Sequence, residues 1–534
     1  MKYPRRTICY YFFTNRINSI FINPLNKPSL SMKSIQKTKT GIDGLDEISG
    51  GGLPQGRPTL VCGGPGCGKT LLAIEFIVKG ATMFNEPGVF IAFEEKTDEL
   101  TANVASLGFD LESLAKNKKL KLDYVHIDRS AIEETGEYDL DGLFIRLAYA
   151  IDSIGAKRVV LDTIENLFAG LTNEGILRAE LRRLFQWLKE KGVTAIVTGE
   201  KGDGNLTRHG LEEYVSDCVI LLDHRIINQV STRRMRIVKY RGSIHGTNEY
   251  PFLIDEEGIT VFPITSLKLD KDVSAKRVSS GIGSLDEMLG GKGFFKGSSI
   301  LVSGSSGTGK TSIAGYFADA TCRRNERCLF FAFEESPKQI IRNLRSIGLD
   351  LDRHVKSGLL DFQSFRPGLH GLEMHLARMY KMVREIKPQT VVLDPITNLV
   401  SVGSLTDVNS MLLRLVDYLQ SEGITLMLTA LNSSSSEHID ENVSSLVDAW
   451  ILVRDIELDG ERNRGIYIMK SRGMKHSKEV REFIISSKGL DLVDVYRAAG
   501  RVLVGSARKA KMKEDMTVKK DPARKLPAKP RKRL

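Results

Sequence analysis

The chain contains the stretch Gly63-Gly-Pro-Gly-Cys-Gly-Lys69-Thr70 and, further on, the stretch Gly304-Ser-Ser-Gly-Thr-Gly-Lys310-Thr311. Both match the pattern G-x-x-x-x-G-K-[ST] in full. In such a loop, backbone N–H groups surround phosphate oxygens, the lysine reaches the β- and γ-phosphates, and the hydroxyl ligates Mg²⁺. A hydrophobic run precedes each loop and a helical pattern follows it, which makes two chance matches improbable. The sequence therefore predicts two sites for ATP and Mg²⁺.

The residues expected to contact the nucleotide come from corresponding positions of the two loops. They are Gly64, Gly66, Gly68, Lys69 and Thr70 in the first loop, and Ser306, Gly307, Gly309, Lys310 and Thr311 in the second.

Each loop is followed by the same succession of motifs. Phe-Glu-Glu occurs at Phe93–Glu95 and Phe333–Glu335, Val-Val-Leu-Asp at 159–162 and 391–394, and Lys-x-Arg-Gly at 239–242 and 470–473. Such self-similarity at a period of about 231–241 residues indicates a duplicated domain and not a solenoid. We expect a first domain over residues 35–266 and a second over residues 267–500 (the first and second copy below).

The positive charge is concentrated at the two ends of the chain. Of the net charge of +11, residues 501–534 carry +10 and residues 1–31 carry +5, which leaves −4 for residues 32–500. This distribution argues against a nucleic-acid-binding core. Residues 1–34 are expected to be either a disordered leader or a segment that results from a start codon assigned too far upstream. Residues 501–534 are expected to form a disordered basic tail that binds nucleic acid weakly, if at all.

The composition indicates a cytoplasmic protein. The six cysteines show no C-x-x-C spacing, which indicates that they are reduced thiols. No apolar run reaches 18 residues, so a membrane span is not expected.

Short apolar runs alternate with helical patterns along both copies. The runs Val159–Leu161, Ala195–Val197, Val391–Leu393 and Thr425–Leu428 are typical of buried parallel strands, and Leu177–Lys191 has the period of a helix. This alternation predicts an α/β fold of two tandem RecA-like P-loop domains with parallel-rich central sheets.

Carboxylates are expected at both nucleotide sites. Asp162 and Asp394 end apolar strands, where they would hold Mg²⁺ directly or through water. The pairs Glu94-Glu95 and Glu334-Glu335 also follow strands, so one member could take a proton from an attacking hydroxyl or water. Glu95 and Glu335 are further candidates for the metal shell. The alternative interpretation of each pair is an acidic helix cap.

A row of basic residues recurs late in each copy. Strand alternation would place its arginines and lysines on one face, where they could contact ATP bound by a neighbouring subunit. The alternative is a solvated edge strand. The members are Arg233, Lys239, Arg241 and His245 in the first copy, and Arg464, Lys470, Arg472 and His476 in the second.

The copies differ just before this row. The two basic rows are 231 residues apart, and at this offset Glu213-Tyr214 of the first copy corresponds to Ser444-Ser445 of the second. The second copy could therefore phosphorylate its own serines, whereas the first could only hydrolyse ATP. A serine-rich loop at 432–436 leaves an inert, solubilising role open.

Taken together, the two loops, the Phe-Glu-Glu stretches, Glu212–Asp217 and the segments Lys239–His245 and Lys470–His476 resemble the KaiC family of double-domain ATPases and autokinases. The resemblance covers about residues 35–500. It implies a homohexamer with ATP between protomers, hydrolysis in the first ring, and autophosphorylation in the second, with Glu334 and Glu335 as base and partner and Ser444 and Ser445 as acceptors.

Two features depart from the family pattern. The acceptor pair is Ser-Ser where the clock proteins have Ser-Thr, and the C-terminus is strongly basic, which argues against binding of KaiA. A KaiB-like partner is expected instead. Two other classes stay open: a RecA/RadA-like DNA-dependent ATPase, and a non-kinase ATP-driven signalling switch in which the serines are inert.

Overall fold

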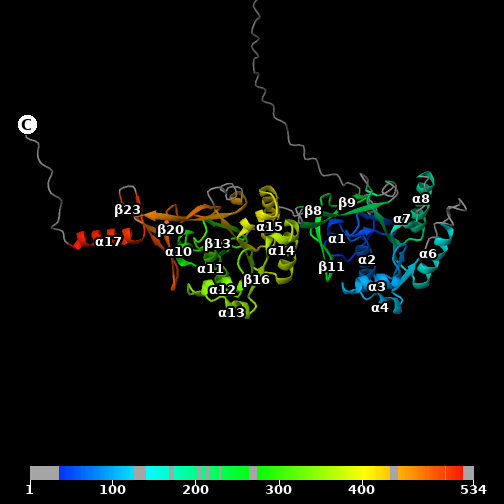
Figure 1. Ribbon diagram of the computed structural model, residues 1–534, viewed down its shortest axis with the longest axis horizontal. Helices are drawn as coiled ribbons and strands as arrows, with labels where there is room; N and C mark the ends of the chain where they lie inside the picture. The colour runs from blue at the N-terminus through cyan, green and yellow to red at the C-terminus, as the bar shows by residue number, and fades with distance from the viewer. Residues whose placement is uncertain are drawn as a thin grey trace, which may run out of the picture.

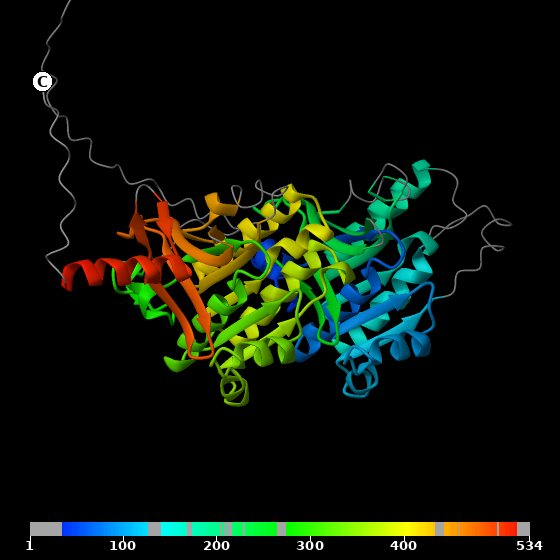
Figure 2. The same ribbon diagram turned by 60° about the vertical axis from the view of Figure 1, so that its left-hand side comes forward.

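The computed structural model describes residues 35–125, 140–167, 174–202, 206–207, 210, 216–227, 230–263, 274–432, 443–458, 460–498 and 501–520. Figure 1 shows two α/β units side by side along the long axis, with the C-terminal helix at one end. Figure 2, turned by 60°, shows the same two units. The predicted leader, residues 1–34, lies outside the described residues.

The first copy is built from the following elements: β1 Lys37–Thr38, α1 Leu45–Ile48, β2 Leu53–Pro54, β3 Pro58–Gly63, α2 Lys69–Met83, β4 Gly88–Ala92, α3 Thr97–Ala105, α4 Leu111–Lys116, β5 Leu120–Tyr124, α6 Asp141–Ile154, β6 Arg158–Asp162, α7 Ile164–Leu167, α8 Glu174–Glu190, β7 Thr194–Glu200, β8 Cys218–Ile227, β9 Val230–Tyr240, β10 Tyr250–Asp255 and β11 Gly258–Val261.

The second copy repeats this order: β12 Arg277–Val278, α10 Gly283–Met288, β13 Phe294–Phe295, β14 Ser299–Gly304, α11 Lys310–Arg323, β15 Cys328–Ala332, α12 Pro337–Arg345, α13 Asp352–Lys356, β16 Leu360–Ser364, η2 Pro367–Leu369, α14 Leu372–Ile386, β17 Thr390–Asp394, η3 Ile396–Ser401, α15 Leu405–Ser421, β18 Thr425–Leu431, β19 Ala449–Leu458, β20 Glu461–Ser471, β21 Arg481–Ser486 and β22 Gly489–Asp494. Strands β23 Tyr496–Ala498 and β24 Arg501–Leu503 and helix α17 Gly505–Lys520 follow.

Within the described residues, each copy contains one nine-stranded sheet. The strand orders are β11-β10-β9-β8-β3-β7-β6-β4-β5 and β16-β15-β17-β18-β14-β19-β20-β21-β22. The strands from β8 to β5, and from β16 to β19, are parallel, and the remaining three of each sheet are antiparallel. The predicted fold class and the four predicted strands are confirmed.

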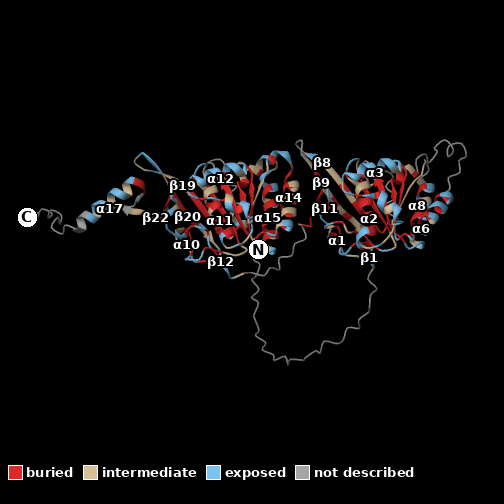
Figure 3. Ribbon diagram, turned by 90° about the horizontal axis from the view of Figure 1, so that it is seen from below, coloured by how far each residue is buried: buried red, intermediate tan, exposed pale blue. Residues whose placement is uncertain are grey.

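Buried residues, drawn in red in Figure 3, lie in the central strands and in the helices that pack on both faces of each sheet. In the first copy, α2 packs on one face and α6 and α8 pack on the other. In the second copy, α11 and α12 cover one face, and α14 and α15 cover the other. Parallel strands buried on both faces need continuous apolar runs, and this explains why the sequence pattern revealed them.

The two copies contact each other through α14, one of the two helices that cover the same face of the second sheet. Leu253 and Phe262 of the first copy join the apolar core under α14, and the ring of Phe262 packs edge-on against Tyr380 at 5.6 Å. Lys381 of α14 pairs with Asp255 at 2.8 Å, and Arg384 pairs with Asp43 at 2.7 Å.

The expected disorder after residue 500 is wrong for residues 501–520. Val504 is buried, and the guanidinium of Arg508 lies 3.0 Å from the carboxylate of Glu482, with only 11% and 7% of the two side chains exposed. These contacts fix the start of α17 against β21. Within the described residues, no helix is both long and apolar enough to cross a membrane.

A buried carboxylate links α2 to the β10–β11 hairpin in the first copy. Glu75 is 1% exposed and accepts a hydrogen bond from the N–H of Ile259 at 2.7 Å. Burial raises the pKa of Glu75 from 4.5 to about 7. Since Lys69 corresponds to Lys310, the same position of the second copy holds Tyr316.

Replacing Glu75→Gln should stabilise the protein at pH 8 but have little effect at pH 4. The folded chain keeps this proton up to about pH 7 while the unfolded chain releases it near 4.5, so folding loses stability as the pH rises across that window. The gain at pH 8 should be at most about 3 kcal/mol, measured by denaturant unfolding at both pH values. Glu99→Gln on the surface of α3 is the control, and an equal effect of Glu75→Gln at both pH values would contradict the argument.

Candidate functional site

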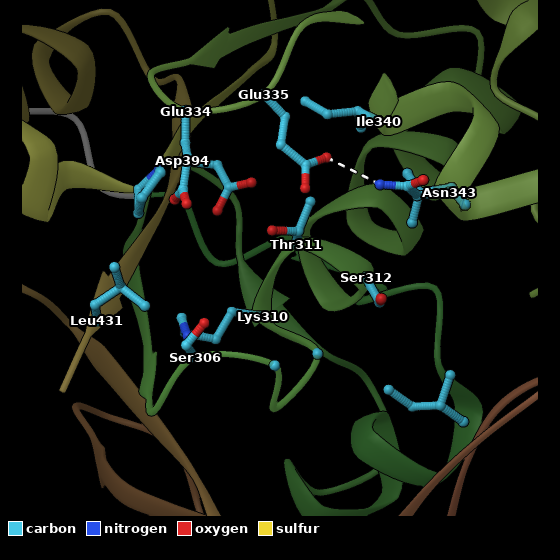
Figure 4. Close-up of a pocket in the computed structure, with 15 residues that line it drawn as sticks. Ser306, Lys310, Thr311, Ser312, Glu334, Glu335, Ile340, Asn343, Asp394 and Leu431 are labelled. Carbon is cyan, nitrogen blue, oxygen red and sulfur yellow. Dashed lines mark hydrogen bonds between the residues drawn. The ribbon is translucent and has the colours of Figure 1, made fainter. Parts of the chain in front are cut away.

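The second copy has a pocket of about 290 Å³ at the carboxyl end of its central strands. The phosphate-binding loop between β14 and α11 forms its floor, and Glu334, Glu335 and Asp394 line the opposite side (Figure 4). The predicted loop residues Ser306, Gly307, Gly309, Lys310 and Thr311 all line it.

The loops are shaped to receive phosphate. Gly68 and Gly309 precede α2 and α11 with φ of 101° and 99°, a left-handed conformation that favours glycine, and neither helix start has a side-chain cap. Backbone N–H groups at a helix N-terminus attract anions. The ammonium of Lys69 donates to the carbonyls of Gly63 and Gly64 at 2.9 and 3.1 Å, and Lys310 does the same in the second loop.

A threonine–aspartate–threonine cluster follows each loop. The hydroxyl of Thr70 donates to Asp162 at 2.9 Å, and Thr198 of β7 donates to the other oxygen of the same carboxylate. Thr311 and Thr429 hold Asp394 in the same way. Burial raises the pKa of both aspartates, while the threonine hydroxyls and the loop lysine lower it. Carboxylate and hydroxyl oxygens beside a phosphate site suit Mg²⁺.

The glutamate pairs lie where their strands end. Glu334 and Glu335 face the loop from the end of β15, and the amide of Asn343 donates to Glu335 at 3.2 Å. In the first copy, Asn103 donates to Glu95 at 3.4 Å and the hydroxyl of Thr163 to Glu94 at 3.5 Å.

Thr163 was not predicted from the sequence, and neither were four neighbours that recur at corresponding positions of the two copies, namely Asn103, Asn343, Thr198 and Thr429. Each asparagine stands eight residues after the second glutamate of its pair, and each threonine 35 or 36 residues after its aspartate. This repeated spacing was the available signal.

The serine pair is held by the basic residues predicted beside it. Lys470 donates to the carbonyl of Ser444 at 2.6 Å, and Arg472 donates to the carbonyl of Ser445 at 2.9 Å. Burial and the charge of Arg472 lower the pKa of Lys470. The side chain of Ser445 is exposed.

The serine pair lies at the edge of the second sheet that is formed by the amino ends of the parallel strands, and the phosphate-binding loop lies at the edge formed by their carboxyl ends. Ser299, the first residue of β14, pairs through its backbone with Asp448, while Gly304 at the last position leads into the loop. A parallel strand rises about 3.3 Å per residue, so these edges are about 17 Å apart. The serines of one chain therefore lie far from the loop of the same copy.

A second pocket, of about 490 Å³, adjoins the basic residues at this far edge. Arg472, Asp448 and Gln420 line its polar side, and Phe295 lines it as well. Here Asp448 accepts hydrogen bonds from the N–H of Ser299 at 2.9 Å and from the amide of Gln420 at 3.0 Å.

The first copy has an equivalent aspartate. Asp217 is buried and lies 2.7 Å from Lys189, 3.6 Å from Arg241 and 3.9 Å from Arg57. The backbone N–H of Arg241 bonds to the carbonyl of Asp217, as that of Arg472 does to Asp448. Glu213 and Tyr214 lie outside the described residues. The imidazoles of His245 and His476 contact nearby carbonyls, those of Gly246 and Met474.

The prediction that each basic row lies on one face of a strand is wrong. A bulge in β20 pairs Ile451 with Ile468 but Trp450 with Lys470, so Met469 is an extra residue. Lys470 therefore lies on the other face from Arg464. A matching bulge at Val219/Ile220 separates Lys239 from Arg233 in β9.

The first arginine of each row lies near the loop of its own copy, because it pairs with the carboxyl end of the neighbouring parallel strand. Arg464 pairs in register with Asp455, whose carboxylate accepts from the loop hydroxyl of Ser305 at 3.0 Å. Burial raises the pKa of Cys67 in the first loop, and the nearby charge of Arg233 acts in the opposite direction. Lys239, Arg241, Lys470 and Arg472 lie instead at the far edge.

Each loop lysine should control one nucleotide. Lys310→Ala should reduce bound ATP from two molecules per chain to one, because the ammonium that balances the phosphate charge is lost, and Lys69→Ala should do the same in the first copy. Calorimetric titration with a non-hydrolysable ATP analogue measures the stoichiometry. Lys292→Ala, on the surface of the second copy, is the control. Two nucleotides bound to either loop variant would contradict the assignment.

Comparison with known proteins agrees with this geometry. The model of the KaiC ATPase family matches twice, over residues 38–266 and 278–496. The chain is 55% identical over 491 residues to the circadian clock protein KaiC2 of Synechocystis, covering 91% of this chain and 86% of that protein. It is 38% identical over 479 residues to the circadian clock oscillator protein KaiC of Synechococcus elongatus, covering 89% and 92% of the two chains. With two tandem KaiC ATPase domains and two ATP sites, the chain belongs to the KaiC family.

Proposed function

We propose that this protein is an ATP-dependent serine autokinase and ATPase that acts as a ring of identical subunits, with six expected from the family resemblance. The observation that carries the proposal is the contact of Lys470 and Arg472 with the backbone of Ser444 and Ser445. Acceptor hydroxyls and phosphate-binding cations are thereby presented together at one edge of the second copy.

The acceptors require a neighbouring subunit. The far edge of the sheet is about 17 Å from the loop of the same copy, so the serines cannot reach the γ-phosphate held there. A ring in which this edge of one protomer faces the loop of the next brings them together. In that arrangement Lys470, Arg472 and His476 contact the neighbour's ATP, and Lys239, Arg241 and His245 do so in the first ring.

The two copies have different activities in this proposal. Residues 35–266 form the domain that hydrolyses ATP and drives assembly, because the acceptor position holds Glu213-Tyr214, which lacks a serine hydroxyl. Residues 267–500 form the autokinase domain.

The catalytic groups are the pocket carboxylates. One glutamate of Glu334 and Glu335 takes the proton of the serine hydroxyl as the γ-phosphoryl group leaves ADP, and Glu94 and Glu95 activate water in the first copy. Thr311 and Asp394 would hold Mg²⁺, together with Glu335, as would Thr70, Asp162 and Glu95 in the first copy. When bound, the ion neutralises charge on the β- and γ-phosphates.

The protein is expected to act in the cytoplasm, where a KaiB-like protein would bind its phosphorylated form. The acidic body of residues 32–500 does not favour a DNA-dependent role.

Incubation of purified protein with Mg-ATP should place phosphate on Ser444 or Ser445, because these hydroxyls lie beside the proposed cationic contacts. Peptide mass spectrometry locates the phosphate. The Ser444→Ala/Ser445→Ala double variant should lose the modification and keep first-domain hydrolysis. Hydrolysis without phosphate on the wild-type chain would reject the autokinase and favour an ATP switch.

Subunit mixing tests transfer between protomers. Lys310→Ala and Arg472→Ala chains should each be unphosphorylated alone, because one lacks ATP in the second copy and the other lacks the arginine supplied to its neighbour. Mixed, the Lys310→Ala chain should become labelled on its serines, since it brings an intact Arg472 to a neighbour with ATP. Mass-tagged chains separate the two products, and the absence of label in the mixture would contradict the arrangement.

A further inference from the structure

Each second glutamate is held by an asparagine from the helix that follows it. Figure 4 shows the amide of Asn343, on α12, directed at the carboxylate of Glu335 across the mouth of the pocket. The donor–acceptor distance is 3.2 Å here and 3.4 Å between Asn103 and Glu95 in the first copy. The same contact therefore occurs in both copies, at the same spacing of eight residues.

A second contact fixes which end of the amide faces the glutamate. The guanidinium of Arg342 donates to the oxygen of Asn343, from Nε at 3.2 Å and from Nη2 at 3.1 Å. Since the oxygen accepts from Arg342, the NH₂ group must be the end that points to Glu335, and only this end can donate to a carboxylate. The first copy has Ala102 at the position of Arg342.

The start of α12 is also defined. Ser336 and Gln339 form a reciprocal capping box directly after Glu335, with Pro337 in the first turn. The helix therefore begins at a set residue, and this places Asn343 two turns further along on the side of Glu335. In the first copy, Lys96 precedes α3 without a side-chain cap.

Packing alone does not explain an asparagine here. Asn103 and Asn343 are exposed and lie in the last turns of α3 and α12. Neither is part of a described apolar core. The side chain of each asparagine instead donates a hydrogen bond to a glutamate of the nucleotide site.

We propose that Asn343 and Asn103 are positioning residues, each of which holds the second glutamate of its pair toward the nucleotide. The inference rests on the proposed role of the glutamates in catalysis. A carboxylate tied to a fixed amide keeps one orientation toward the phosphates and the threonine–aspartate cluster, while the first glutamate of the pair is left to approach the attacking hydroxyl or water. Arg342 makes this restraint firmer in the second copy than in the first.

The experiment compares Asn343→Ala and Asn343→Asp with the wild type, and measures three quantities. Phosphorylation of Ser444 and Ser445 should slow about 10-fold in Asn343→Ala, as for other residues that orient a ligand of the reacting centre. Asn343→Asp should be slower still, because a second carboxylate repels Glu335. Affinity for a non-hydrolysable ATP analogue and the melting temperature should match the wild type in Asn343→Ala, which adds no charge to the pocket.

The matched control is the other copy. Asn103→Asp should slow hydrolysis in the first copy and leave serine phosphorylation per bound ATP unchanged, whereas the Asn343 variants should leave first-copy hydrolysis unchanged. Arg342→Ala should have a smaller effect than Asn343→Ala on phosphorylation.

The outcomes separate the two proposals. Wild-type protein that hydrolyses ATP but labels no serine would reject the autokinase, and Asn103→Asp would then decide the positioning role through hydrolysis alone. Labelled wild-type protein together with Asn343→Asp that reacts at the same rate would overturn the positioning role while keeping the autokinase. A lowered melting temperature that accounts for the whole loss would assign Asn343 to structure and also overturn it.

Discussion

The direction of the central parallel strands is the constraint on which the rest of the structure depends. All parallel strands of a sheet end at one edge, so the loop, the buried aspartate and the glutamate pair of each copy meet there. The serine pair precedes a strand that runs in the same direction and therefore lies at the opposite edge. Within one chain, Ser444 and Ser445 are thus separated from the second phosphate-binding loop by the length of the sheet's strands.

The two copies share one scaffold and differ in a few side chains around their nucleotide sites. Both copies keep the lysine, the threonine–aspartate–threonine cluster and the asparagine-held glutamate. They differ around the first glutamate, where Thr163 of the first copy donates to Glu94 and the second copy has Pro395, which has no donor. They also differ at the P-loop helix, where buried Glu75 is replaced by Tyr316.

The contact between the copies involves the β10–β11 hairpin, which also packs against α2, the helix that follows the first phosphate-binding loop. On one side of the β10–β11 hairpin, Ile259 donates a hydrogen bond to Glu75 of α2, and on the other side Asp255 pairs with Lys381 of α14. Arg234 of β9 pairs with Glu373 at the start of the same helix. The side chains of these ion pairs are 24–48% exposed, so the apolar contact around Phe262 and Tyr380 supplies most of the stabilisation between the copies.

Sequence by itself determined the fold class, the duplication and the residues of the two phosphate-binding loops, because these depend on local patterns: glycines for a tight turn and continuous apolar runs for buried strands. Tertiary structure alone decided that a bulge puts Arg464 and Lys470 on opposite faces of β20, and that Arg508 and Glu482 anchor a helix in a basic tail. It also brought Asn343 to Glu335. Each of these depends on strand register or on contacts between distant segments, which the periodicity of one chain segment does not encode.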